Sequence, residues 1–226
     1  MDSNDNKEDF YINLYEELYS QHGYHASNDI DTTHYKWLFN SCIDPSNIQY
    51  KTVLDIGCSA GIGIKKLFEP RGKICKGIDV SETAIKRAKS LGVSAQVASI
   101  TNVPFDDNSF DLVCSTDVIE HLKTEDQEQA WRECFRTSKK YVAHKISNTP
   151  EGNKFANKVL HLTCWSHDKW LDFFQSLDLN DWKIIYSITP SVWEDIKYKV
   201  YWMKEPPSYD LWNFHNTCLV FEKDEK

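Results

Sequence analysis

Short apolar runs alternate with amphipathic segments from Thr52 to about Ser147. The apolar runs predict strands at 52–56, 74–78, 95–98, 110–114 and 141–146, and the amphipathic segments predict helices at 62–69, 82–90 and 125–137. Strands that are apolar on both faces and alternate with helices are typical of a parallel sheet that helices cover on both sides. The pattern therefore predicts a doubly wound α/β domain.

The two ends of the chain follow other patterns. Aromatic residues at helical spacing between Phe10 and Cys42 predict one or two amphipathic helices. A helix is predicted near Ser166, and strands near 182–188 and 217–222 predict a hairpin that closes the sheet. We expect a single domain over 1–226, with a disordered tail at 1–9, an N-terminal helical lid at 10–50, a ligand-binding core at 51–147 and a substrate-side extension with the closing hairpin at 148–226.

Composition and charge narrow the class of protein. The 226 residues are 41% hydrophobic and 27% charged, and no apolar run approaches the ~18 residues of a membrane span. The acidic start, Met1 to Asp9, lacks the pattern of a signal peptide. A net charge of −8 repels phosphate backbones and anionic lipid, so we expect neither a nucleic-acid partner nor a membrane partner.

The cysteine pattern indicates a reducing compartment. There are seven cysteines, an odd number, with no Cys-x-x-Cys pair and no histidines at zinc-finger spacing. Most lie among apolar neighbours, where a free cysteine acts as a small buried hydrophobic residue. We therefore predict a cytoplasmic protein without a disulfide framework or a structural zinc ion.

A glycine-rich turn follows the first predicted strand. The sequence is Val53-Leu54-Asp55-Ile56-Gly57-Cys58-Ser59-Ala60-Gly61-Ile62-Gly63. A strand, a glycine turn and a helix start form the place where an open α/β sheet binds its ligand. The spacing G-x-x-x-G-x-G differs from the G-x-G-x-x-G of dinucleotide-binding folds, which disfavours a nicotinamide cofactor.

This segment resembles motif I of the class I S-adenosylmethionine (SAM)-dependent methyltransferases. The similarity continues through Gly77-Ile78-Asp79-Val80-Ser81 and through the stretch from Asn102 to Leu122. The resemblance implies a Rossmann-like fold with a mostly parallel seven-stranded sheet and an antiparallel last strand. It also implies a methyltransferase that uses SAM as donor and releases S-adenosylhomocysteine.

The resemblance also implies which residues bind the cofactor. Asp55 and Gly57 would shape the methionine end of the site, Gly61 would allow close approach of the backbone, and Asp79 would hold both ribose hydroxyls. The expected cofactor-binding set is Asp55, Gly57, Gly61, Asp79, Val80, Ser99, Ile100 and Thr116. Ser99 departs from the family, which usually has an aspartate facing the adenine amino group there. The stretch 135–141 departs as well, because it lacks the family's proline-glycine turn.

Two histidines are candidate catalytic bases. His121 follows the fourth predicted strand, and His144 lies at the end of the fifth, which is a favoured position for catalytic groups in parallel sheets. A hydroxyl acceptor needs such a base within hydrogen-bond reach. Each histidine can instead have a structural role, His121 by positioning the helix after strand four and His144 as a hydrogen-bonded core residue.

A metal site is the less favoured interpretation of two other clusters. Asp117, Glu120 and His121 offer three ligand types within one helical turn, but acids at this position also complement a helix dipole. His161-x-x-Cys164-x-x-His167 lacks a fourth ligand at a recognisable spacing and is expected to line or cover the pocket. No metal ligand is therefore predicted.

The acceptor is predicted less directly than the donor. Aromatic residues around Tyr24 and Trp37 and in 193–212, together with Lys197, Lys199 and Lys204, suggest a flap over a small polar metabolite. We expect O-methylation of a sugar, a nucleotide-linked sugar or a phosphorylated precursor of a surface glycan, as in polysaccharide biosynthesis. N-methylation of a small amine or protein side chain, or a catalytically silent SAM-binding protein, are the alternatives. The oligomeric state is left open.

Overall fold

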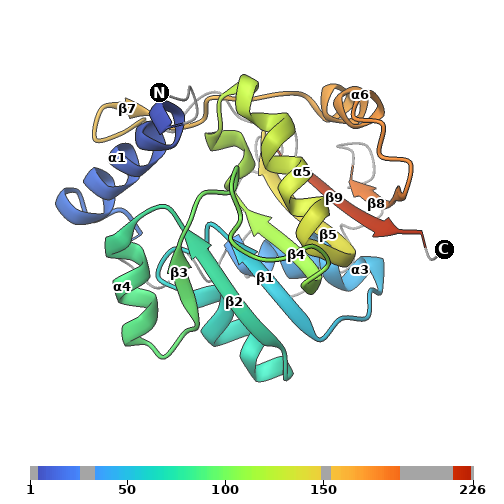
Figure 1. Ribbon diagram of the computed structural model, residues 1–226, viewed down its shortest axis with the longest axis horizontal. Helices are drawn as coiled ribbons and strands as arrows, with labels where there is room; N and C mark the ends of the chain where they lie inside the picture. Colours follow the sequence, from blue (N-terminus) through green and yellow to red (C-terminus); the bar gives the residue numbers. More distant parts are fainter. Residues whose placement is uncertain (1–4, 26–33, 149–153, 189–215, 225–226) are drawn as a thin grey trace, which may run out of the picture.

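A seven-stranded sheet forms the centre of the computed structural model, which describes residues 5–25, 34–148, 154–188 and 216–224 (Figure 1). Its strands are β1 (Thr52–Ile56), β2 (Ile74–Asp79), β3 (Ala95–Val97), β4 (Phe110–Thr116), β5 (Ser138–Ser147), β8 (Trp182–Ile188) and β9 (Asn216–Lys223). They lie in the order β3-β2-β1-β4-β5-β9-β8, and β9 runs antiparallel to both of its neighbours. The predicted doubly wound, mostly parallel sheet with an antiparallel last strand is confirmed.

Helices cover both faces of the sheet. The longer ones are α1 (Asp5–Gln21), α4 (Glu82–Ser90), α5 (Gln127–Thr137) and α6 (His167–Ser176), and a helical run at 34–46 includes η1 (Phe39–Ile43) and α3 (Asp44–Ser46). Shorter elements are η2 (Ile64–Phe68), η3 (Glu69–Arg71), η4 (Ile119–His121), η5 (Thr124–Asp126) and the small ribbon of β6 (Lys154–Phe155) and β7 (Lys158–Val159). Among the helices that the structure describes, none combines the length and the apolar character needed to cross a bilayer.

Serine caps mark two of the helix starts. The Ser81 side chain accepts a hydrogen bond from the backbone N–H of Ala84 at the start of α4, and the Ser166 side chain accepts one from Lys169 at the start of α6. A side-chain acceptor at this position satisfies one of the backbone donors that a helix start leaves unpaired. The predicted helix near Ser166 is thereby confirmed.

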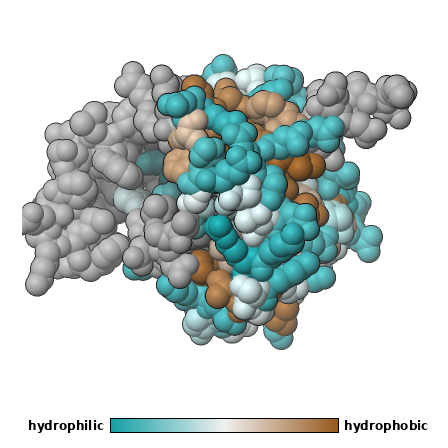
Figure 2. Space-filling view, turned by 90° about the vertical axis from the view of Figure 1, so that its left-hand side faces the viewer, coloured by the Kyte–Doolittle hydropathy of each residue, from teal (hydrophilic) through white to brown (hydrophobic). Residues whose placement is uncertain are grey.

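The N-terminal helix begins earlier than predicted. Residues 5–9 belong to α1, so the expectation of a disordered tail over 1–9 is wrong for them, and residues 1–4 lie outside the described residues. Acidic residues are favourable in the first turns of a helix, where they complement its dipole. One side of α1 buries Tyr11, Leu18 and Tyr19, while Figure 2 shows the side of the molecule that bears α1 as mainly hydrophilic.

Each strand sends alternate side chains to opposite faces of the sheet. On one face, Val113, Val142 and Leu219 pack in a core that includes Trp131 of α5 and Trp170 of α6. On the other face, the neighbouring residues of the same strands, such as Leu112, Ala143 and Val220, pack against the helical run at 34–46. Both cores contain aromatic residues, and the sheet is buried on both faces, as its apolar strands predict.

The connection between α5 and β5 has no loop. The helix ends at Thr137 and the strand begins at Ser138. The loop before β4 stabilises this junction. The backbone N–H groups of Asn108 and Ser109 donate hydrogen bonds of 2.8 and 2.9 Å to the carbonyl oxygens of Arg136 and Thr137. These bonds hold the junction without the proline-glycine turn that is missing from 135–141.

Candidate functional site

The glycine turn (Gly57–Gly63) lies at the carboxyl end of β1 and requires glycine at two positions. Gly57 and Gly61 have φ values of +67° and +73°, in the left-handed region. A Cβ on Gly57 would lie 2.4 Å from the Val118 side chain, and one on Gly61 would lie 3.0 Å from Val93. The two glycines therefore let the turn pack closely against the segments that follow β4 and α4.

Asp79 links this turn to the end of β2. Its carboxylate accepts hydrogen bonds from the backbone N–H of Ser59 at 3.0 Å and from that of Ser81 at 2.9 Å. The side chain is 8% exposed. A buried carboxylate thus stands between the glycine turn and the start of α4, at the position where the resemblance expects the ribose.

Helix α1 reaches the same edge of the sheet. Its Glu16 carboxylate accepts hydrogen bonds from the Ser81 hydroxyl at 2.7 Å and the Thr83 backbone N–H at 3.0 Å. Burial raises the pKa of Glu16, but the hydrogen bonds from Thr83 and Ser81 outweigh it and leave the pKa below its usual value. An ionised Glu16 therefore fastens α1 to the first turn of α4, next to Asp79.

Tyr35 holds a second buried carboxylate, that of Asp55 near the end of β1. Its hydroxyl donates a hydrogen bond of 2.6 Å to the Asp55 carboxylate, and both side chains are buried. A Cβ on Gly63 would come within 2.5 Å of the Tyr35 ring. The helical run at 34–46 thus packs directly on the glycine turn, which the sequence pattern did not predict.

The remaining predicted cofactor residues lie at the ends of β2, β3 and β4. Val80 packs against the core, Ile100 is buried, and the Ser99 hydroxyl shares a hydrogen bond of 2.7 Å with the Thr101 hydroxyl. The Thr116 hydroxyl donates to the Asp117 carboxylate at 3.1 Å. The structure therefore brings all the predicted cofactor residues to the ends of adjacent parallel strands, where an open α/β sheet binds its ligand.

An ion pair follows β4. Asp117, with a left-handed φ of +53°, contacts the ammonium group of Lys145 from β5. Burial alone would raise the pKa of Asp117, but Lys145 and His34 lower it below its usual value. This pair was missed at the sequence level, because Lys145 follows His144 in an apolar strand and only the sheet register places it beside Thr116.

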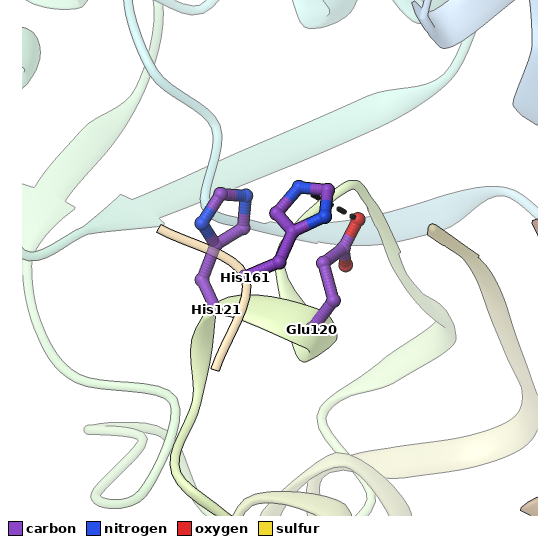
Figure 3. Close-up of side chains that lie close together, drawn as sticks. All are labelled: Glu120, His121 and His161. Atoms are coloured by element: carbon purple, nitrogen blue, oxygen red, sulfur yellow. Dashed lines mark ion pairs between the residues drawn. The ribbon is translucent and has the colours of Figure 1, made fainter. Parts of the chain in front are cut away.

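A cluster of two imidazoles and a carboxylate lies just beyond this pair. We call Glu120, His121 and His161 the His–Glu cluster, and Figure 3 shows their side chains directed toward one another. His121 is 9% exposed, and its Nδ1 lies 2.7 Å from the Tyr15 hydroxyl and 3.1 Å from the Leu160 carbonyl oxygen. Burial and the neighbouring His161 lower the pKa of His121 to about 3.

Glu120 is fully buried. Burial and the charge of Asp117 raise its pKa well above the usual range. A neutral imidazole and a carboxyl of raised pKa on one loop can accept a proton or bind a cation. His121 therefore stays a candidate base, while its contacts with Tyr15 and His161 could not be seen in the sequence.

His144 lies elsewhere. The strand β5 continues to Ser147, so His144 is not at its end, and its side chain points to the face covered by α5, fully buried against Trp131 with ring centroids 4.6 Å apart. Its Nδ1 shares a hydrogen bond of 2.6 Å with Ser115, and burial lowers its pKa to about 3. The alternation of β5 directs His144 into the core and not to the strand end, and this placement disfavours its predicted role as a catalytic base.

Other sequence-level candidates are dispersed. His167 starts α6 and lies 3.4 Å from Thr217, whereas His161 joins the His–Glu cluster, so the motif from His161 to His167 does not act as a unit. None of the seven cysteines, all of which the structure describes, forms a disulfide bond in it. The aromatic and lysine-rich segment 193–212 lies outside the described residues.

Comparisons with known proteins agree with this architecture. A family model described as a methyltransferase domain matches residues 54–141. The norajmaline N-methyltransferase of Rauvolfia serpentina is 35% identical over 103 residues, which cover 42% of this chain and 34% of that protein. The chloroplastic tocopherol O-methyltransferase of Arabidopsis thaliana is 38% identical over 80 residues, or 32% of this chain and 23% of that protein.

The matched stretches thus span about a third or less of the length of these curated relatives. The fold agrees over a longer stretch with a solved structure, the complex between the Haloferax volcanii Trm112 methyltransferase activator and the putative methyltransferase. The TM-score is 0.66 at 15% identity, with 94% of this chain and 98% of the other covered. The domain match over residues 54–141 and the sheet topology both agree with the resemblance to the class I SAM-dependent methyltransferases.

Proposed function

We propose that this protein transfers a methyl group from SAM to an oxygen of a small polar acceptor. The observation that carries the proposal is the buried Asp79 carboxylate, which lies beside the backbone of a glycine turn at the ends of parallel strands. A carboxylate there suits the two ribose hydroxyls of SAM, and the open turn admits its methionine part.

Methyl transfer requires that the protein align the reactants and shield them from water. SAM supplies a methyl group on a positively charged sulfur, and that charge disappears as the acceptor attacks from the opposite side. The protein therefore gains most by aligning the acceptor and excluding water. Helix α1 and the helical run at 34–46 support this role, since Glu16 and Tyr35 fasten them to the edge that bears the glycine turn.

An oxygen acceptor is the favoured class because of the His–Glu cluster. A hydroxyl must lose its proton during transfer, and His121 offers a neutral imidazole at this edge of the sheet. The sugar or phosphorylated glycan precursor predicted from the sequence is retained as part of the proposal. Its warrant is the segment 193–212, outside the described residues.

Nitrogen methylation is the second candidate. It is favoured by the similarity to an N-methyltransferase over 103 residues. A neutral amine needs no base, only a geometry that exposes its lone pair. Replacing His121 would then leave the turnover rate nearly unchanged, which separates the two candidates.

The seven cysteines, none of which forms a disulfide bond in the structure, support a cytoplasmic location within the same proposal. Five of these thiols are buried and two are half-buried in the structure. Thiols persist in this state in a reducing compartment.

The proposal is tested by calorimetric titration of SAM and S-adenosylhomocysteine into the wild-type protein and into Asp79→Asn. Loss of charge-assisted hydrogen bonds, each worth roughly 1.5–3 kcal/mol, predicts a loss of affinity of about tenfold to a hundredfold. Asp106→Asn is the matched control, since Asp106 is an exposed residue that precedes β4 at the opposite edge of the sheet.

Melting curves of both variants check that the fold is retained. Turnover is then followed as release of S-adenosylhomocysteine with hydroxyl and amine acceptors. Absence of binding of both ligands to the wild-type protein would contradict the proposal. If Asp79→Asn and Asp106→Asn bind SAM with equal affinity, Asp79 has no part in the proposed cofactor site.

A further inference from the structure

The His–Glu cluster has the composition of a metal site. Glu120 and His121 come from η4, immediately after β4, and His161 comes from the segment between β7 and α6. One ligand atom from each residue lies within 4.8 Å of the others. Two imidazoles and one carboxylate are a ligand set that binds divalent first-row transition ions and leaves further coordination positions open.

Backbone hydrogen bonds hold the two halves of the cluster together. The carbonyl oxygen of Glu120 accepts bonds from Leu162 at 2.8 Å and Thr163 at 3.0 Å, and the Thr163 hydroxyl donates to the Leu122 carbonyl at 2.7 Å. These contacts join segments about 40 residues apart in the sequence, so His161 is placed beside η4 by a rigid backbone connection. Backbone hydrogen bonds, and not only side-chain positions, therefore bring the residues of the cluster together.

The Glu120 carboxylate has an unsatisfied oxygen. Its Oε1 accepts a hydrogen bond of 2.9 Å from the Ser147 backbone N–H, whereas Oε2 is buried without a hydrogen-bond partner. The Nε2 of His161 lies 4.0 Å from Oε1, which is too far for a hydrogen bond. A buried carboxylate oxygen without a partner is costly, and a cation in this space would satisfy it.

The distances allow an ion after a modest contraction of the cluster. Bonds of ~2.0–2.2 Å to nitrogen and oxygen place neighbouring ligand atoms roughly 3.0–3.6 Å apart. The separations of 4.0 Å between His161 and Glu120 and of up to 4.8 Å within the cluster would therefore contract by roughly half an ångström to 2 Å. Rotation of the three side chains can supply a movement of this size.

Outer contacts orient the ligands. The Leu160 carbonyl oxygen can accept a hydrogen bond from Nδ1–H of His121. This tautomer has its lone pair on Nε2, the ring nitrogen that Figure 3 shows on the side of His161. Tyr15 of α1 contacts the same Nδ1, and Ser147 holds Glu120. Carbonyl and backbone partners of this kind fix ring orientation and tautomer in known metal sites.

We propose that Glu120, His121 and His161 bind a divalent first-row transition ion, of the class of Zn²⁺, Mn²⁺ or Fe²⁺, with open positions that an acceptor oxygen can occupy. The catalytic part of this inference rests on the proposed function. With the ion bound, His121 would act on the acceptor as a ligand of the ion and not as a free base. The acceptor hydroxyl would release its proton to water more easily beside the ion, its oxygen would form the new bond to the methyl carbon, and the electron pair of the breaking carbon–sulfur bond would return to sulfur.

The test measures ion binding directly. The full chain is stripped with chelator, exchanged into buffer and titrated with Co²⁺, whose visible absorption reports its ligands, and then with Zn²⁺ and Mn²⁺ by calorimetry. We expect one equivalent of Co²⁺ per chain and a loss of affinity of at least a hundredfold in His161→Gln. His22→Gln is the control, because His22 is an exposed histidine paired with Glu17 at the end of α1.

Glu120→Gln is a second variant that keeps an acceptor for the Ser147 N–H and removes the ligand charge. Binding of no stoichiometric ion, or equal binding to His161→Gln and His22→Gln, would overturn the proposal. Titration of SAM into the same samples keeps the two proposals apart. SAM binding without ion binding contradicts only the metal site, whereas loss of SAM binding in the wild-type protein contradicts the proposed function.

Discussion

Two buried regions of this protein each centre on a histidine whose pKa is lowered to about 3. In the region beneath α5, His144 is enclosed by Trp131 and the sheet, with Ser115 as its hydrogen-bond partner. In the His–Glu cluster, His121 meets a second imidazole, a carboxylate and a tyrosine. The same shift in pKa therefore arises in a packed core and in a polar cluster, and the two regions differ in the groups that surround the ring.

The largest expected effect comes from removing the aromatic core around His144. Trp131→Ala should lower the free energy of unfolding by about 3–5 kcal/mol, because it leaves a cavity among fully buried rings. Chemical denaturation measures this loss. Trp165→Ala, a half-buried tryptophan at the margin of the same aromatic group, is the control and should cost clearly less. Equal losses would show that the region beneath α5 is not the main core.

The second prediction compares the two histidines in catalysis. On the proposed O-methylation, His121→Gln should lower turnover by about a hundredfold, a typical contribution of an acid–base group. His144→Gln, a matched change in the core, should alter stability but leave the turnover of folded protein within about twofold. Release of S-adenosylhomocysteine is the readout. A larger loss of turnover in His144→Gln would reverse the roles assigned to the two regions.

The third prediction concerns pH. Both histidines have folded-state pKa values of about 3, below the ordinary value of 6.5. Between these two pH values the unfolded chain therefore binds protons that the folded chain does not bind. Stability is therefore fully present above pH 6.5 and falls as the pH drops toward 3. Between pH 6.5 and pH 5 the free energy of unfolding of chelator-treated protein should fall by roughly 1.5 kcal/mol for each histidine.

Denaturation at a series of pH values measures this slope. His144→Leu and His121→Gln should each remove about half of it. A slope that only one of the variants reduces would show that the other region is hydrated or otherwise relieved of the burial that lowers the pKa.

The smallest effect is expected at the edge of the His–Glu cluster. Tyr15→Phe removes the hydrogen bond to His121 and should cost about 1 kcal/mol of stability. Tyr11→Phe is the control on the same helix, since the Tyr11 hydroxyl donates to Asp126 and not to the cluster. The two variants should lose similar stability in denaturation. Only Tyr15→Phe should change the affinity for Co²⁺, and an equal change in both would separate Tyr15 from the cluster.

Local patterns account for much of the fold and for the cofactor edge. The apolar runs identify the strands from β1 to β5 because a strand covered on both faces must be apolar at every position. The glycine spacing identifies the turn after β1, where two residues need left-handed backbone conformations. The position of Asp79 follows as well, since the ends of parallel strands lie at one edge of the sheet.

Other features have no local signal. The parity of β5 decides that His144 points into the core and Lys145 toward Asp117, and a pattern of apolar residues on both faces cannot reveal that parity. The helical start at Asp5 depends on packing of Tyr11, Leu18 and Tyr19 against the domain, which outweighs the polar composition of the first residues.

Strand periodicity and backbone conformation are local properties of the chain, so the class of fold, the glycine turn and the carboxylate at the end of β2 can be predicted from the residues alone. The folded domain is needed to show that His161 lies beside Glu120 and His121 and that Tyr15 contacts the His121 ring. These residues come from three separate segments, so their meeting depends on backbone hydrogen bonds and helix packing that form when the whole domain folds.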